Sequence, residues 1–205
     1  AAPRERIEVT TDVLKLVFDT EGGSIVRSEF LKFDQTEHPG QAFVLLDDSP
    51  QRTYQAQSGL IGGPFPTHKT AMRFTGERTL AEGASELVLR FESPELGGLK
   101  LVKTYTLRRG DYVAQVRHEV VNTGGQPVSP QLYVQLVRDG NPAPGGTSFY
   151  STFTGPAFYT DAKKFQKVEF ADIDKGKAQF VTQAPDGWVA MVQPYFASAW
   201  LLPPG

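Results

Sequence analysis

Apolar and polar residues alternate in two runs, 99–108 and 112–122, that are joined by a short polar turn. A period of two is typical of strands with one buried face. Gly110 in the turn tolerates a positive φ, so the sequence predicts a long β-hairpin. Lys103 interrupts the apolar face of the first run, and we expect its stem to lie along apolar surface while its ammonium stays in water. Because an isolated hairpin is marginally stable, other strands must pack on it.

Further strand patterns, separated by turn residues, fill most of the chain. Residues 47–50 are expected to end one strand as a turn, and Asp161 to cap a single helical turn. Residues 1–6 are polar and contain a proline, which predicts a frayed leader. Strands are expected at residues 7–9, 13–18, 24–30, 42–46, 54–60, 72–74, 86–91, 132–137 and 188–192.

The fold class follows from these short strands, because the sequence shows neither a long helix nor an internal repeat. We expect an all-β fold of antiparallel sheets with long hairpins, irregular Gly/Pro-rich loops and little helix. A two-layer sandwich is favoured over a closed barrel, in a single domain that spans residues 1–205.

The composition excludes several classes of protein. Fourteen Phe, seven Tyr and two Trp supply enough large apolar side chains for a sizeable core. A formal charge of −2, without any basic cluster larger than a pair, argues against nucleic-acid binding. The chain has no cysteine, which excludes disulfides, thiolate metal sites and cysteine nucleophiles. No apolar run approaches 18 residues, so neither a membrane span nor a signal peptide is expected.

Candidate catalytic and metal-binding residues are few. His118 lies next to Glu119, and a histidine with a carboxylate would suit sugar chemistry. Adjacent residues of a strand point to opposite faces, so we interpret His118 as a hydrogen-bonded or partly exposed structural histidine. His38 and His68 lie in loops without a second ligand at metal spacing, and we interpret both as surface residues.

Paired acidic residues also receive a structural interpretation. Asp47 and Asp48 are expected in the turn that ends a strand, and Asp172 and Asp174 on a solvated strand face. None of the Gly-Gly pairs precedes a helix pattern with Lys and Ser/Thr, so no phosphate-binding loop is expected. We predict no catalytic residue, no metal ligand, no cofactor-binding residue and no cofactor.

Six separated segments carry a family resemblance. They are TDVL at 11–14 with GG at 22–23, YQAQSGL at 54–60, LAEG at 80–83, KTY at 103–105 with LRRGDY at 107–112, the segment 153–160, and GWVAM at 187–191 with YFA at 195–197 and AW at 199–200. In this order, and over nearly the whole chain, they resemble the large periplasmic domain of the YidC family of bacterial membrane protein insertases. Six motifs in one order are far more specific than any one of them.

The resemblance implies a β super-sandwich, the fold of galactose mutarotases, placed between the first two transmembrane helices of a Gram-negative inner-membrane protein. It implies a non-catalytic role on the periplasmic side, in a soluble domain that is membrane-tethered in the full-length protein and assists insertion and folding of inner-membrane proteins. The implied partners are the Sec translocon components SecF, SecD and SecYEG, and nascent inner-membrane proteins. The family domain continues past the segment like Ala199-Trp200, so we expect this chain to lack C-terminal strands and a membrane-leading helix.

The candidate partner surface is the aromatic sequence at 149–170 and 187–202, although the same spacing would also serve as core with a solvated rim. We expect some of Phe158, Tyr159, Phe165 and Tyr195 to be unusually exposed and to lie close together.

Trp188, by contrast, is expected in a strand buried against the sandwich. The alternative function is a sugar-binding or aldose-epimerase-like protein on the same fold. That function would need a cleft with converging histidine and carboxylate groups, or a flat platform of Trp and Tyr.

Overall fold

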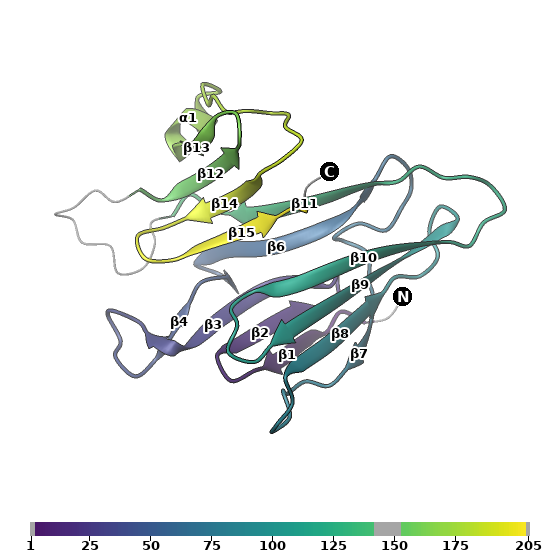
Figure 1. Ribbon diagram of the computed structural model, residues 1–205, viewed down its shortest axis with the longest axis horizontal. Coiled ribbons are helices and arrows are strands. Elements are labelled where there is room, and N and C mark those ends of the chain that lie inside the picture. The colour runs from purple at the N-terminus through teal and green to yellow at the C-terminus, as the bar shows by residue number, and fades with distance from the viewer. Residues whose placement is uncertain (1–2, 142–152, 204–205) are drawn as a thin grey trace. The chain divides into compact units, whose positions relative to one another are not determined.

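The computed structural model describes residues 3–141 and 153–203, and the chain divides into two compact units, Ala1–Val137 and Arg138–Gly205. Two β-sheets are built from the earlier strands and a third from the later ones (Figure 1). The all-β class is therefore confirmed. The expectation of one domain over residues 1–205 stays a prediction.

A seven-stranded sheet, here called the large sheet, contains the hairpin β2–β3, formed by two of the predicted strands. Its main order is β1-β2-β3-β6-β11, with β4 paired to β3 and β5 paired to β6. Its strands are β1 (Arg6–Thr10), β2 (Leu14–Asp19), β3 (Ser24–Asp34), β4 (Ala42–Val44), β5 (Asp47–Ser49), β6 (Arg52–Ile61) and β11 (Gln131–Arg138).

Two local predictions in the large sheet are corrected. Asp47 and Asp48 do not form a strand-terminating turn; they lie in β5, where ion pairs with Arg27 and Arg6 offset their charge. The frayed leader does not reach residue 6, since Arg6 begins β1 and the main chain of Glu5 is held. The Glu5 N–H donates to Thr20 Oγ1 (2.8 Å), and the Thr20 N–H donates to the Glu5 carbonyl (2.9 Å).

A four-stranded sheet, here called the small sheet, is built around the predicted long hairpin. Its order is β10-β9-β8-β7, and β9 and β10 pair without interruption from Ala114 opposite Leu107 to Asn122 opposite Leu99. Gly110 in the connecting turn has a φ of 73°, as the sequence predicts. The strands are β7 (Arg73–Gly76), β8 (Glu86–Glu92), β9 (Leu99–Arg108) and β10 (Ala114–Asn122).

The large and small sheets pack face to face around a core of aromatic rings. Phe18 of β2 contacts Phe91 of β8 and Tyr105 of β9, with ring centroids 5.4 and 4.9 Å apart. Each such ring contributes roughly 1.5–3 kcal/mol through burial. The Tyr105 hydroxyl donates to the Gly23 carbonyl at 2.7 Å, so the buried phenol keeps a hydrogen-bond partner. The predicted two-layer sandwich is confirmed.

The second unit contains a four-stranded antiparallel sheet, here called the C-terminal sheet, in the order β13-β12-β14-β15. Its strands are β12 (Gly155–Thr160), β13 (Lys164–Lys167), β14 (Trp188–Val192) and β15 (Ala197–Leu201). Among the described residues, no helix is long enough to cross a membrane.

The helix prediction is corrected. The helical residues form α1 (Phe170–Asp174), which begins after Glu169, so Asp161 caps no helix. The Asp161 N–H instead donates to the Asp186 carboxylate. Asp172 and Asp174 lie in α1, exposed as expected but not on a strand.

Candidate functional site

A row of apolar side chains crosses one face of the C-terminal sheet. Phe165, Tyr159, Trp188 and Leu201 are successive cross-strand partners, so they project from the same face. We call these four residues the apolar row. Its two ends are the most open, since Phe165 is 50% and Leu201 is 65% exposed.

The aromatic rings of the apolar row are held in contact. The rings of Tyr159 and Trp188 are parallel within 10°, with centroids 5.6 Å apart, and the Phe165 ring lies 6.0 Å from that of Trp188. The Lys164 ammonium lies 5.8 Å from the Tyr159 ring centroid, a cation–π arrangement. Because Tyr159 and Trp188 stack on each other, they do not form the flat platform that sugar binding would require.

The structure brings together only two of the four predicted interface residues, Tyr159 and Phe165. Phe158 points to the opposite face of β12, where its ring stacks on Phe180 with centroids 4.6 Å apart. Tyr195 lies between β14 and β15 and is 83% exposed. Phe165 and Tyr195 are thus unusually exposed, as expected, but the four residues do not form one cluster.

Trp188 is the residue of the apolar row that the sequence misplaced. The strand β14 forms as predicted, and Ala190 and Met191 are buried within it. Trp188 itself is only half-buried and stands beside its cross-strand partner Tyr159.

A polar pocket of about 140 Å³ opens beside the start of β3 and the polar face of β6. Asp19, Glu21 and Ser24, around the β2–β3 turn, form one wall. Gln55 and Gln57 of β6 and the loop residues His68 and Lys69 also line it. This pocket was not predicted from the sequence, although the Gln-Ala-Gln alternation in β6 marks a polar strand face.

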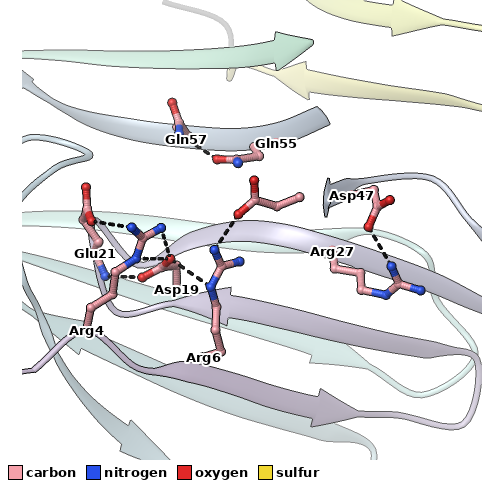
Figure 2. Close-up of polar contacts among 9 residues, drawn as sticks. Arg4, Arg6, Asp19, Glu21, Arg27, Asp47, Gln55 and Gln57 are labelled. Carbon is pink, nitrogen blue, oxygen red and sulfur yellow. Dashed lines mark hydrogen bonds and ion pairs between the residues drawn. The ribbon is translucent and has the colours of Figure 1, made fainter. Parts of the chain in front are cut away.

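Arginine side chains form ion pairs with the acidic residues that line the pocket. Figure 2 shows Arg4 and Arg6 reaching the same carboxylate, that of Asp19, whose side chain is almost fully buried. The second Asp19 oxygen accepts the Glu21 N–H at 2.8 Å, and Arg4 also pairs with the Glu21 carboxylate at 3.2 Å. The charge of Asp19 is therefore neutralised and hydrogen-bonded, as a buried carboxylate requires.

Two amide side chains are linked on the other side of the pocket. The Gln57 Nε2 donates to Gln55 Oε1 at 3.0 Å, as Figure 2 also shows. Gln135 of β11 donates in turn to Gln57 Oε1 at 2.6 Å. His68, which we expected at the surface, is half-buried and bonded to Tyr133 of β11 through both its main-chain N–H and its ring Nδ1.

The expectation that the Lys103 ammonium stays in water is wrong. The whole residue is buried, and Nζ donates to the carbonyls of Gly22 and Ser58 at 2.6 and 2.7 Å. Burial lowers the pKa of Lys103 to about 7. Since Lys103 belongs to the small sheet and Ser58 to the large one, the hydrogen bond from this buried ammonium links the two sheets.

His118 is a hydrogen-bonded histidine, as predicted. Its Nε2 lies 2.8 Å from Ser58 Oγ, and it is the cross-strand partner of Lys103. Burial, with a smaller effect of the Lys103 charge, lowers the pKa of His118 to about 4. No carboxylate in the described parts of the chain pairs with His118, so the histidine–carboxylate arrangement of a sugar-acting enzyme is not formed here. Residues 3–141 and 153–203 contain no cluster of three His, Asp or Glu that could hold a metal.

The comparisons with known proteins agree on one family. The family model for the YidC periplasmic domain matches residues 6–205. A membrane protein insertase YidC from Bordetella petrii is 48% identical over 209 residues, which cover 100% of this chain and 37% of that protein. The corresponding insertase from Aromatoleum aromaticum is 49% identical, with 98% of this chain and 37% of the relative covered.

A third relative extends the same finding. The membrane protein insertase YidC of Cupriavidus necator is 50% identical over 198 residues, with 96% of this chain and 35% of the relative covered. The chain therefore spans little more than a third of the length of these curated relatives.

Proposed function

Since this chain belongs to the YidC periplasmic domain family, we propose that it is a non-catalytic domain that assists a membrane protein insertase from the periplasmic side of the inner membrane. The insertase supported in this way would insert and fold inner-membrane proteins. The family match supports this role, and the absence of a carboxylate partner for His118 within the described residues agrees with it.

The apolar row is the observation that carries the proposed mode of action. Exposed aromatic residues that are packed against one another lose little conformational entropy on binding, and such residues dominate the energy of protein interfaces. Phe165 is exposed and packs against the partly buried Trp188, which stacks on the partly buried Tyr159. Lys164 adds a positive charge at the edge of the row. We assign the row to contact with another polypeptide.

Two kinds of partner suit this surface. One is a component of the Sec translocon (SecF, SecD or SecYEG), and the other is a nascent inner-membrane protein whose apolar segment has not yet entered the bilayer. A nascent chain would bind briefly, while a translocon subunit would bind at fixed positions. The partner that forms crosslinks distinguishes the two.

Site-specific photocrosslinking in cells that carry the full-length protein tests this proposal. A photoreactive phenylalanine is placed at Phe165, Tyr159 or Tyr195, and at the control positions Gln115 and Arg117 of β10, which are exposed polar sites on the sandwich. We expect Phe165 and Tyr159 to crosslink to Sec subunits or to newly made membrane proteins, and the control positions to give no such products.

The companion measurement is mutational. Phe165→Ser should reduce crosslinking from Tyr159 while the isolated chain keeps its melting temperature, because the Phe165 ring is half-exposed. Crosslinks from the β10 positions alone would place the interface on the sandwich and refute the assignment to the apolar row.

A further inference from the structure

The polar pocket presents hydrogen-bond donors whose acceptors are missing. Each of its two amide oxygens already accepts a hydrogen bond, Gln57 Oε1 from Gln135 and Gln55 Oε1 from Gln57. The series of amides therefore ends at the Gln55 NH2 group, which donates no hydrogen bond within the described residues. An amide NH2 offers two donors and no acceptor.

The ring of His68 also presents a hydrogen-bond donor. The Tyr133 hydroxyl accepts the His68 main-chain N–H at 3.0 Å, so its own proton is available to His68 Nδ1. Nδ1 then accepts, and the proton of the neutral imidazole lies on Nε2. Burial and the nearby charges of Lys69 and Lys103 lower the pKa of His68, which favours this neutral form. Tyr133 and Gln135 are two positions apart on β11, so one strand face orients both donors.

A buried hydroxyl marks the same pocket independently. Ser24 is 2% exposed and lines the pocket, and its Oγ has no hydrogen-bond partner within the described residues. Most buried hydroxyl groups are hydrogen-bonded, and an unpartnered one costs about 1–3 kcal/mol. A ligand oxygen in the pocket would satisfy it.

One cation at the pocket, Lys69, is available to pair with a ligand. Arg4 and Arg6 are shared among Asp19, Glu21 and Asp48. Lys69 lines the pocket and forms no ion pair with any described residue. Together, Arg4, Arg6 and Lys69 balance the three carboxylates, so any bound anion adds negative charge. A singly charged anion that pairs with Lys69 adds the least, whereas a dianionic phosphate would face Asp19 and Glu21 with too little positive charge.

We propose that the polar pocket binds a single carboxylate group. Lys69 supplies the charge, and the Gln55 amide and the His68 Nε2–H supply directional donors to the two carboxylate oxygens. The volume of about 140 Å³ corresponds to roughly five water molecules, which suits a carboxylate with a few attached carbons. The carboxylate can come from a small organic acid or from a peptide.

An NMR titration tests the proposal. Sodium acetate is added to the isotope-labelled chain at pH 7 and constant ionic strength, and the side-chain amide of Gln55 and the ring of His68 are followed. We expect saturable shifts with a dissociation constant on the order of millimolar, as for other ligands of a few atoms. Acetamide, which lacks the charge, and inorganic phosphate, which carries too much, should each bind about tenfold more weakly or worse.

Matched variants separate the pocket from general surface effects. Lys69→Gln should weaken acetate binding about tenfold, and Gln55→Met by a smaller factor. Lys32→Gln and Gln115→Met remove the same groups at exposed positions outside the pocket and should leave binding unchanged. A thermal melt of each variant verifies that the fold is retained.

The source of the carboxylate is distinguished with tripeptides. Gly-Ser-Gly with a free C-terminus, the same peptide with a C-terminal amide, and Gly-Glu-Gly amide are compared with acetate. Tighter binding of a peptide identifies a C-terminus or an acidic side chain as the source, and tighter binding of acetate identifies a small acid. The proposal is overturned if acetate produces no saturable shift at about ten times the expected dissociation constant, or if acetamide or phosphate binds as well as acetate. Unchanged acetate binding by Lys69→Gln would equally refute it.

Discussion

Replacing Lys103 by methionine removes a buried ammonium from the centre of the sandwich and preserves most of its volume. In the native chain, the ammonium donates to the Gly22 and Ser58 carbonyls. The variant leaves both carbonyls without this donor, which costs about 1–3 kcal/mol for each. It also relieves the desolvation of a charge that has no counterion in the described structure. Because these effects oppose each other, the informative quantity is the difference in pH dependence.

The magnitude of that difference follows from the pKa. Burial lowers the pKa of Lys103 from 10.5 to about 7 in the folded chain. Above pH 7 the folded chain loses this proton while the unfolded chain retains it, so the free energy of unfolding rises with pH until about 10.5. At about 1.4 kcal/mol for each pH unit, the native chain gains about 3 kcal/mol between pH 7 and 9.5. Lys103→Met lacks this gain.

Urea denaturation at several pH values from 6 to 9.5 measures the effect. Far-UV circular dichroism follows the whole chain, whereas both tryptophans, Trp188 and Trp200, report on the second unit. Titrations common to both chains cancel when the free energies of unfolding are subtracted. The titration of Tyr105, whose pKa is raised by burial, is also avoided below pH 9.5.

We expect the native chain to become more stable than Lys103→Met by about 3 kcal/mol across this range, with unchanged denaturant slopes. Parallel free-energy curves from pH 7 to 9.5 would refute the reasoning. They would show that the two carbonyls keep the ammonium charged throughout and that desolvation does not dominate its pKa.

Three further changes have defined outcomes. The pKa of His118 is lowered to about 4, so the free energy of unfolding should fall by about 2 kcal/mol as the pH drops from 6.5 to 4. In urea denaturation, His118→Gln should not show this decrease. Trp188→Ala should cost roughly 2 kcal/mol by urea denaturation, less than for a fully buried Trp because Trp188 is only partly buried; a cost near zero would contradict its packing on Tyr159. Gly187→Ala should lower the melting temperature far more than Gly83→Ala. Both glycines have positive φ, but a Cβ at Gly187 would meet the Tyr159 carbonyl while Gly83 has open space; equal losses would refute the clash.

The regular part of the fold could be predicted because it depends on local patterns. Alternation places the long hairpin within two residues of β9 and β10, and Gly110 marks its turn. The face on which His118 lies was also predictable, since it follows from the period of two. Its partner Ser58, 60 residues away, was not.

The residues whose surroundings were predicted wrongly depend on partners that are distant in the sequence. Lys103 is buried because carbonyls 81 and 45 residues away meet its ammonium, and no local pattern encodes them. Asp47 and Asp48 join a strand because Arg27 and Arg6 compensate their charge. Propensity alone favours a turn at such acidic residues, and tertiary contacts overrode it here.

The candidate sites were predictable to different extents. The aromatic composition pointed to Tyr159 and Phe165, and cross-strand register brings them together with Trp188. The polar pocket was not foreseen, because Ser24 and Gln55 are unremarkable in sequence and become informative only through unmet hydrogen bonds.

The β2–β3 turn imposes an order of events on folding. Its glycine carbonyls accept from Lys103 and Tyr105, which follow 81 and 82 residues later. Contacts of such long sequence separation slow folding, because closing the long intervening loop costs conformational entropy before the contact forms. A chain that emerges N-terminus first exposes Phe18 and its apolar neighbours until β8 and β9 have followed, and exposed strands of this kind aggregate. During synthesis, the apolar face of β2 therefore stays without its partner sheet until β9 has emerged.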